Sequence, residues 1–369
     1  MIKSFYDIFC KIGAVLSIVL FLLLIISAYN KYFTPTEYST LSIVALAFPY
    51  LVIFVIVLSL CWLILRKWIY SICGIISLLI CLPQLTISFP LNINDAIKND
   101  KNRQIKIMSY NIYYGYDVEK PDIDYSRSIS EILASDADIV CLQELTKLKA
   151  YKRSKITKSQ FDSLRIAYPH IIETKGIDVM CLSKHPIEYI KPKTKRNPFT
   201  KRFDAYKVRI GNDSLTIINV HLTSFKLKNE QLDMVENLID KNIEAYKKDV
   251  TDSVLFKLKN AFKRRSISSE ILRNYLDSIQ GDIIVCGDFN DVDNSWSYHK
   301  VKGNDFKDAH SEVGCGPLIT YNFNHMWFGI DHILYKGSLR PIKFERGNLL
   351  SSDHYSISCT FEINNKLNK

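Results

Sequence analysis

The chain has 369 residues, with 48 Lys and Arg against 38 Asp and Glu, so its formal net charge is +10. Apolar residues make up 47% and charged residues 23%, which excludes disordered, collagen-like and low-complexity proteins. The nine cysteines form no CxxC pair, so the sequence does not support a zinc finger or a thioredoxin-type site.

The charge is unevenly distributed, and the first 90 residues are strongly apolar. Their charged residues are Lys3, Asp7, Lys11, Lys31, Glu37, Arg66 and Lys67. Three apolar runs, at 12–28, 41–65 and 68–85, each approach the ~20 residues that cross a bilayer core. The first run resembles a signal peptide, but two more runs follow it and no small-residue cleavage site precedes Asn30. We therefore expect a membrane anchor of three transmembrane helices over 1–90, with Pro49 kinking the second helix.

Basic residues near the ends of the runs predict the orientation of the anchor. Lys3, Lys11, Arg66 and Lys67 favour a cytoplasmic N-terminus, with Lys31 outside. Three spans then place everything after residue 90 outside the cytoplasm. Basic residues after the third run oppose this orientation, but long domains cross membranes largely regardless of charge.

The remaining sequence predicts a linker at 91–104 and one domain at 105–369. Apolar β-like runs alternate with helical stretches, which predicts stacked α and β layers. The expected strands are 105–110, 139–142, 179–182, 206–210, 215–220, 283–286, 333–335 and 355–361, and the expected helices are 126–134, 161–166, 229–246 and 254–279. The last helix carries a basic cluster at 257–265, typical of a solvated helix face, with phosphate contact as the alternative.

Polar residues gather where the predicted strands end, which is where layered α/β folds place ligand groups. They are Asn111, Gln143, Glu144, His221, Asp288, Asn290, Asp331, His332, Asp353 and His354. Carboxylates and amides suit Mg²⁺ or Mn²⁺ better than tetrahedral zinc. Carboxylates near a hard cation and histidines near an anion together indicate hydrolysis of a phosphate ester.

These residues belong to an ordered series of short motifs. The series is Ser109-Tyr110-Asn111, Gln143-Glu144, Asn219-Val220-His221-Leu222, Gly287-Asp288-Phe289-Asn290, Ile330-Asp331 and Ser352-Asp353-His354. Over about 105–361 it resembles the endonuclease/exonuclease/phosphatase superfamily. The anchored layout and the region from Asp288 to Asn322 are similar to membrane-anchored members from Bacteroidetes-type bacteria.

The resemblance implies an α+β fold, a four-layer α/β sandwich of two facing mixed β-sheets flanked by helices and preceded here by three transmembrane helices. It implies Glu144 as the main Mg²⁺ or Mn²⁺ ligand, with Asn111 beside it and Asp353 on the metal side. Asp288 would deprotonate the attacking water, and Asn290 would position Asp288. His354, held by Asp331, would donate to a phosphate oxygen, and His221 would make a second phosphate contact. His332 is expected to be structural.

The implied function is that of a divalent-metal-dependent phosphoesterase in a bacterial plasma membrane, with its catalytic domain outside the cytoplasm. A phosphodiester in nucleic acid or in a lipid headgroup is the first expectation. The alternatives are a phosphomonoesterase acting on a polyphosphorylated small molecule, such as an inositol phosphate, and a non-catalytic phospho-ligand-binding protein. Tyr113 and Gly329-Ile330 stand where abasic-site endonucleases carry an acid and Trp-Arg, which disfavours a DNA-repair function. No oligomeric state is predicted.

Overall fold

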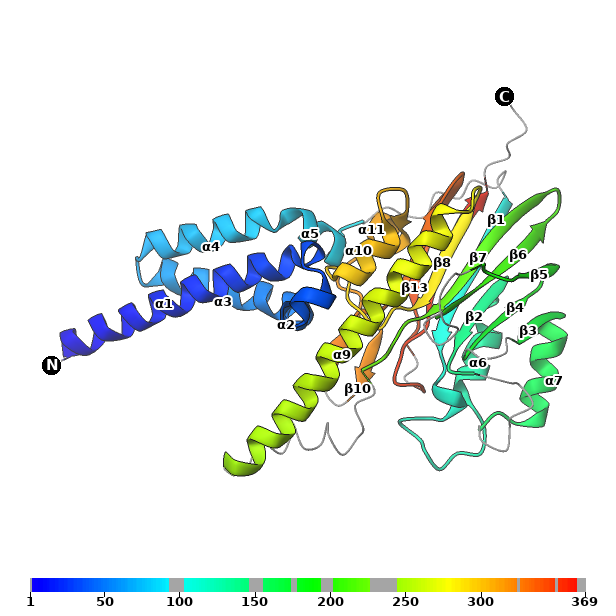
Figure 1. The fold of residues 1–369 in the computed structure, drawn as a ribbon, viewed down its shortest axis with the longest axis horizontal. Coiled ribbons are helices and arrows are strands. Elements are labelled where there is room, and N and C mark those ends of the chain that lie inside the picture. The colour runs from blue at the N-terminus through cyan, green and yellow to red at the C-terminus, as the bar shows by residue number, and fades with distance from the viewer. Residues whose placement is uncertain are drawn as a thin grey trace.

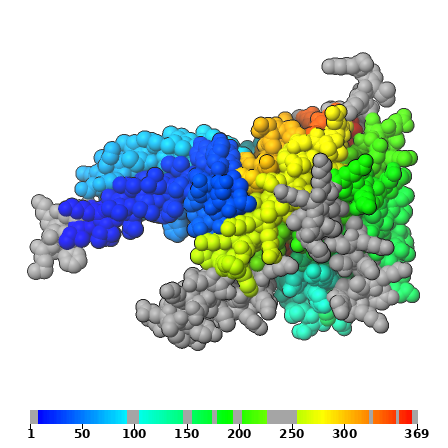
Figure 2. Space-filling view, in the orientation of Figure 1, coloured from blue at the N-terminus to red at the C-terminus, as the bar shows by residue number. Residues whose placement is uncertain are grey.

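The computed structural model describes residues 2–92, 103–145, 155–173, 178–193, 202–225, 244–323, 326–348 and 351–363. It consists of a helical N-terminal unit that projects from one side of a β-sandwich (Figures 1 and 2). The helix expected at 229–246 lies almost entirely outside the described residues, as does most of the expected linker. The start of that linker is paired with the sandwich, because the Asn92 side chain donates to the Ser311 and Gly314 carbonyls at 3.0 Å.

Five helices and one 3₁₀ turn form the N-terminal unit. They are α1 (Ile2–Ala28), η1 (Asn30–Tyr32), α2 (Pro35–Leu46), α3 (Phe48–Ile64), α4 (Trp68–Ile80) and α5 (Leu82–Ser88). Among the described residues, α1 is long and apolar enough to cross a membrane by itself, over Ile8–Ala28. The number of possible spans rises to three if the bent pairs α2–α3 and α4–α5 each count as one.

Both bends follow from proline. The α2–α3 pair bends by 54° and the α4–α5 pair by 64°. Pro49 and Pro83 lie in the first turns of α3 and α5, where the missing N–H costs no helical hydrogen bond. A proline there cannot continue the preceding helix, so the apolar runs at 41–65 and 68–85 each form two helices.

The first sheet of the sandwich has six strands in the order β13-β14-β1-β2-β4-β3. Its strands are β1 (Arg103–Asn111), β2 (Ile139–Gln143), β3 (His170–Glu173), β4 (Val179–Ser183), β13 (Leu339–Arg346) and β14 (Ile357–Ile363). The β1–β2 pair is parallel and the others are antiparallel, so the sheet is mixed.

The second sheet has the order β5-β6-β7-β8-β12-β9. Its strands are β5 (Ile187–Ile190), β6 (Phe203–Ile210), β7 (Asp213–His221), β8 (Ile283–Asp288), β9 (Lys307–Asp308) and β12 (Asp331–Lys336). The β7–β8 pair is parallel and the other pairs are antiparallel. A separate hairpin pairs β10 (Tyr321–Phe323) with β11 (Met326–Phe328).

Alternating side chains build the layers, because successive residues of a strand point to opposite faces. Ile107 of β1 and Ile284 of β8 share the core between the sheets. Met108 instead packs under α6 (Arg127–Ala134) and α7 (Lys158–Ala167), while Val285 packs under α9 (Glu244–Asp277) and α10 (Trp296–Lys302). The remaining elements are η2 (Tyr113–Gly115) and α11 (Ala309–Val313). The expected pair of mixed sheets flanked by helices is confirmed.

Candidate active site

The strand register brings the polar strand ends to one edge of the two sheets. In the second sheet, His221 of β7 and Asp331 of β12 both lie opposite Asp288 of β8. In the first sheet, Asn111 of β1 lies opposite Gln143 of β2, and Glu144 follows directly. The parallel pairs β1–β2 and β7–β8 therefore present their carboxyl ends together, as sheet folds with ligand sites generally do.

A glycine allows two strands to come unusually close beside the candidate site. Gly287 has φ of +145°, and a Cβ at this position would lie 2.0 Å from the Val220 carbonyl oxygen. Only glycine allows β8 to approach β7 this closely just before Asp288. The motif Gly287-Asp288 thus has a steric basis that is independent of any chemistry.

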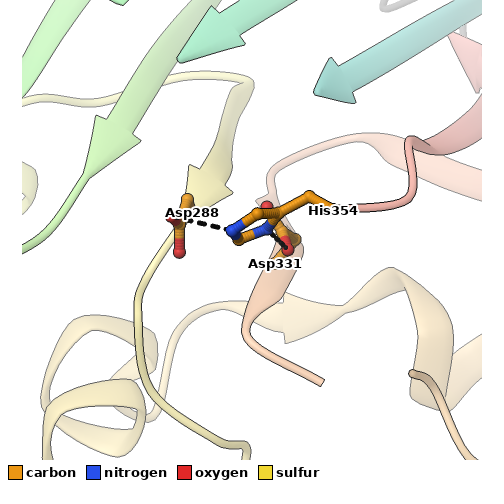
Figure 3. A group of neighbouring side chains, drawn as sticks. All are labelled: Asp288, Asp331 and His354. Atoms are coloured by element: carbon orange, nitrogen blue, oxygen red, sulfur yellow. Dashed lines mark hydrogen bonds and ion pairs between the residues drawn. The ribbon is translucent and has the colours of Figure 1, made fainter. Parts of the chain in front are cut away.

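Three buried side chains, Asp288, Asp331 and His354, form the centre of the site (Figure 3). His354 Nδ1 lies 2.8 Å from Asp331 Oδ2, and its Nε2 lies 3.8 Å from Asp288 Oδ2. Burial alone lowers the pKa of His354, but the two carboxylates outweigh it and raise the pKa well above the ordinary value. His354 is therefore an imidazolium between two carboxylates.

Amide groups also hold the Asp288 carboxylate, at both of its oxygens. The Asn290 N–H donates to Oδ1 at 2.7 Å, and the side-chain amides of Asn290 and Asn111 donate to Oδ2 at 2.9 and 3.1 Å. The first of these hydrogen bonds closes an Asx turn, so the same interaction forms the turn and positions the carboxylate. Burial is the main reason that the pKa of Asp288 is raised, with Asp331 adding to it and His354 opposing it.

His221 approaches the same carboxylate oxygen as His354. Its Nε2 lies 3.7 Å from Asp288 Oδ2 and 3.9 Å from Glu144 Oε1, and its Nδ1 lies 3.1 Å from Asp178 Oδ1. Burial lowers the pKa of His221, but Asp178, Asp288 and Glu144 outweigh it and raise the pKa to about 9. Two imidazolium groups, His221 and His354, thus face Asp288 Oδ2 with their Nε2 atoms.

The negative charge of Glu144 is disfavoured by burial and by neighbouring carboxylates. Burial raises its pKa to about 7; His221 opposes this shift, and Asp353 and Asp288 add to it. Asp353 accepts a hydrogen bond from the Ser352 hydroxyl at 3.1 Å, and the Asn111 side-chain oxygen accepts from the Tyr113 N–H at 3.2 Å. A divalent cation beside Glu144, Asn111 and Asp353 would relieve this repulsion, and all three offer the oxygen donors that Mg²⁺ prefers.

The central trio also has metal-ligand chemistry, since one ligand atom from each of Asp288, Asp331 and His354 lies within 4.8 Å of the others. Nδ1 of His354 is already engaged with Asp331 at 2.8 Å, and the amides of Asn290 and Asn111 hold the Asp288 carboxylate. Two places in the site offer metal-ligand chemistry: this trio, and the oxygen donors of Glu144, Asn111 and Asp353.

Three further residues lie around the site, and only one of them, His332, was named in the sequence analysis. His332 lies apart from the centre, with Nε2 2.9 Å from the Asp291 carbonyl. Tyr321 packs edge-on against His354, with ring centroids 5.1 Å apart. Sequence reasoning missed both Tyr321 and Asp178. An acid directly before the apolar strand Val179–Ser183 was the signal available for Asp178.

Comparison with known proteins was made by sequence and by structure. A search of curated proteins found no match. Zebrafish (D. rerio) TDP2 complexed with single-strand DNA product is 16% identical, covers 71% of this chain and 100% of its own, and has a TM-score of 0.48. An endonuclease/exonuclease/phosphatase from Bacteroides vulgatus is 17% identical, with coverages of 71% and 100% and a TM-score of 0.45. ANGEL2, a 2′,3′-cyclic phosphatase, is 16% identical, with coverages of 73% and 97% and a TM-score of 0.44.

Two family models match the chain itself. One, described as a domain of unknown function, matches residues 9–88, the helical N-terminal unit. The other matches residues 108–354, which is more than half of the chain and contains every candidate site residue named above. The protein therefore belongs to the endonuclease/exonuclease/phosphatase family.

Proposed function

We propose that the protein is a divalent-metal-dependent phosphodiesterase that hydrolyses nucleic acid or a lipid headgroup by in-line attack of water. The observation that carries this proposal is the placement of His221 and His354, whose Nε2 atoms lie 3.7 and 3.8 Å from Asp288 Oδ2. A base flanked by two cationic donors is what attack at phosphorus needs, because charge grows on the phosphate oxygens.

Each residue of the centre has a step in this proposal. Asp288 takes a proton from water while Asn290 and Asn111 hold its carboxylate in one orientation. Its raised pKa makes it a stronger base than an exposed carboxylate. His354 and His221 donate to non-bridging phosphate oxygens. Asp331 fixes the proton on Nδ1 of His354 and keeps the ring cationic.

Glu144, with Asn111 and Asp353, would hold Mg²⁺ or Mn²⁺. When bound, the ion would withdraw charge from the phosphate. Glu144 suits this role because its partly buried carboxylate, repelled by Asp353 and Asp288, would be stabilised by a cation. The alternative function, a phosphomonoesterase acting on a polyphosphorylated small molecule, would use the same residues. A non-catalytic protein that binds a phosphorylated ligand would also use these residues, but without turnover.

We also propose that residues 1–90 form a membrane anchor, that 91–104 is a linker and that 105–369 is the catalytic domain. The N-terminal helices expose large apolar side chains from Ile8 to Leu22, Ile53 to Leu65 and Trp68 to Leu82. A belt of this size is far larger than a soluble monomer exposes, and a bilayer would cover it. The proposed location is a bacterial plasma membrane, crossed three times, with the catalytic domain outside.

Hydrolysis of bis(4-nitrophenyl) phosphate and of 4-nitrophenyl phosphate by the full chain in detergent tests the function. We expect the diester to be cleaved only with Mg²⁺ or Mn²⁺, and Asp288→Asn to lower the rate on the order of 10²–10⁴-fold. Asp136→Asn removes an exposed acid elsewhere and serves as the control. Cleavage of the monoester alone would favour the monoesterase, and undiminished turnover by Asp288→Asn would refute the mechanism.

A further inference from the structure

A cavity of about 560 Å³ lies between α9 and the segment that follows β7. Three basic side chains line it, Arg202, Lys257 and Arg264, together with the polar residues Thr223, Ser224 and Asn260. Its lining within the described part of the chain includes no acidic residue. Lys257 and Arg264 come from the basic cluster of α9, whose role the sequence left open between a solvated face and phosphate contact.

Two lining residues of the cavity are close to His221 of the candidate active site. The His221 N–H donates to the Arg202 carbonyl at 2.9 Å, so Arg202, which directly precedes β6, lies beside His221 of β7. Thr223 follows His221 by two residues. Between them, the Leu222 carbonyl accepts a hydrogen bond from the Asn290 side chain at 3.1 Å. One short segment therefore forms the wall of the cavity and contacts the group that holds Asp288.

Buried Arg265 makes this wall rigid. Its Nε donates to the Thr223 carbonyl at 3.0 Å, and its Nη1 lies 3.1 Å from Asp291 Oδ2. The guanidinium also stacks on Phe225 and Phe262, 4.5 and 5.0 Å from their ring centroids. The cavity therefore has a fixed position relative to Asp288 and Asn290.

The chemistry of the lining selects an anion with several acceptor oxygens. Guanidinium groups match phosphate geometry, and hydroxyl and amide groups add donors. The volume is within the usual range for small-molecule sites.

We propose that this cavity binds a second phosphate group of the substrate, beside the phosphate that is hydrolysed. The proposal rests on the function proposed above and narrows the substrate to one that carries at least two phosphates. The second phosphate could belong to the next nucleotide of a nucleic acid strand or to a phosphorylated lipid headgroup, and the two share the chemistry that the cavity recognises.

Paired substrates with and without the second phosphate test the proposal on the full chain. One pair is the thymidine dinucleotide with or without a 5′-phosphate, and the other is glycerophosphoinositol with or without a 4-phosphate. We expect the extra phosphate to raise kcat/KM about five- to tenfold, less at high salt, in whichever pair contains the natural chemistry. The responding pair identifies the source of the phosphate.

One arginine variant and one lysine variant, at adjacent positions on α9, distinguish binding in the cavity from a general effect of positive charge. Arg264→Ala removes a lining cation, and Lys263→Ala removes an exposed cation that does not line the cavity. The rise in kcat/KM caused by the second phosphate should disappear in Arg264→Ala and persist in Lys263→Ala. An equal loss in both variants, an undiminished gain in Arg264→Ala, or no gain in either pair would overturn the proposal.

Binding provides a readout that does not need turnover. Titration calorimetry with the Asp288→Asn chain should show that, within the responding pair, the compound with the second phosphate binds more tightly. Adding Arg264→Ala to that chain should abolish the difference in affinity between the two compounds. If bis(4-nitrophenyl) phosphate is hydrolysed but neither pair shows a difference, the cavity proposal fails and the function stands. If no ester is hydrolysed, the function fails, and calorimetry still decides whether the cavity binds phosphate.

Discussion

The Asn294 side-chain amide donates hydrogen bonds to the Ser27 and Ala45 carbonyls, at 2.9 and 3.0 Å. It thereby joins the ends of α1 and α2 to the loop that leaves the candidate active site, four residues after Asn290. The neighbouring Asp293 is partly buried in this junction, where its carboxylate accepts hydrogen bonds from the side chains of Gln84 and Ser88 at 3.1 and 2.9 Å. The N-terminal helices therefore clamp the loop that carries Asp288 and Asn290.

Substitution of Asn294 by Ala should loosen this clamp. We expect kcat to fall about tenfold with KM nearly unchanged, because Asp288 would be held less firmly while the phosphate contacts of His221 and His354 remain. The stability loss should be about 1–3 kcal/mol, the usual cost of leaving buried polar groups unpaired. Steady-state kinetics and thermal unfolding in the same detergent measure the two effects.

The control for this substitution is Asn92→Ala. Asn92 donates to backbone carbonyls across the same junction, at Ser311 and Gly314, but does not touch the loop from Asp288 to Asn294. It should lower stability without lowering kcat. If both variants reduce kcat equally, the N-terminal helices support the domain as a whole and not the catalytic loop.

The ion pair of Asp331 with His354 predicts the pH dependence of the rate. Asp331→Asn keeps the shape but removes the charge that, against burial, raises the pKa of His354. Loss of the His354 proton is expected to lower the rate, so the alkaline limb of the pH–rate profile should move to lower pH in this variant. The measurement is kcat/KM against pH at saturating Mg²⁺, and an unmoved alkaline limb would disprove the pairing.

The same pair predicts how stability depends on pH. The folded-state pKa of His354 is raised above the unfolded value, so its contribution is fully present below the unfolded pKa and is lost as pH rises through the folded pKa. Asp331→Asn should therefore destabilise the protein most at acidic to neutral pH. Denaturant unfolding of both proteins across this range gives the comparison.

Orientation in the membrane is a separate prediction. The basic residues Lys3, Lys11, Arg66 and Lys67 predict a cytoplasmic N-terminus, and three proposed spans would place residue 369 outside. An alkaline phosphatase fused to the C-terminus should be active in a bacterial host, and a green fluorescent protein fused there should be dark. The reverse result would contradict both the number of spans and the outside location.

The sequence predicted the central strands because they are nearly continuous apolar runs. β2, β4 and β8 are buried along their whole length, which produces that pattern. The edge strands β5 and β13 were missed because they are half-exposed and mix charged with apolar residues. Their pairing comes from neighbours in the sheet, which no local pattern reveals.

The candidate site was partly visible for a similar reason. Strand ends collect at one edge, so the rule that found Asn111, His221 and Asp288 is geometric, and the structure brings these residues together. Asp178 pairs with His221 across the two sheets, and Asn294 contacts Ala45 from 249 residues away. Contacts of this kind depend on how complete layers pack, and local periodicity carries no information about them.

Glu144 should make the effect of Mg²⁺ on stability depend on pH. In the metal-free protein its pKa is raised from 4.5 to about 7, mainly by burial, so the stability contributed by its neutral form is present below pH 4.5 and lost as pH rises through about 7. Above pH 7 this partly buried carboxylate is charged and unfavourable, and a bound cation should reverse that effect. Mg²⁺ should therefore raise Tm more at pH 8 than at pH 5 in the unaltered chain.

Glu144→Gln should abolish this difference, whereas Glu119→Gln, at an exposed acid, should preserve it. Thermal unfolding with and without Mg²⁺ at the two pH values measures it, and an equal Mg²⁺ response in Glu144→Gln would remove Glu144 from the metal site.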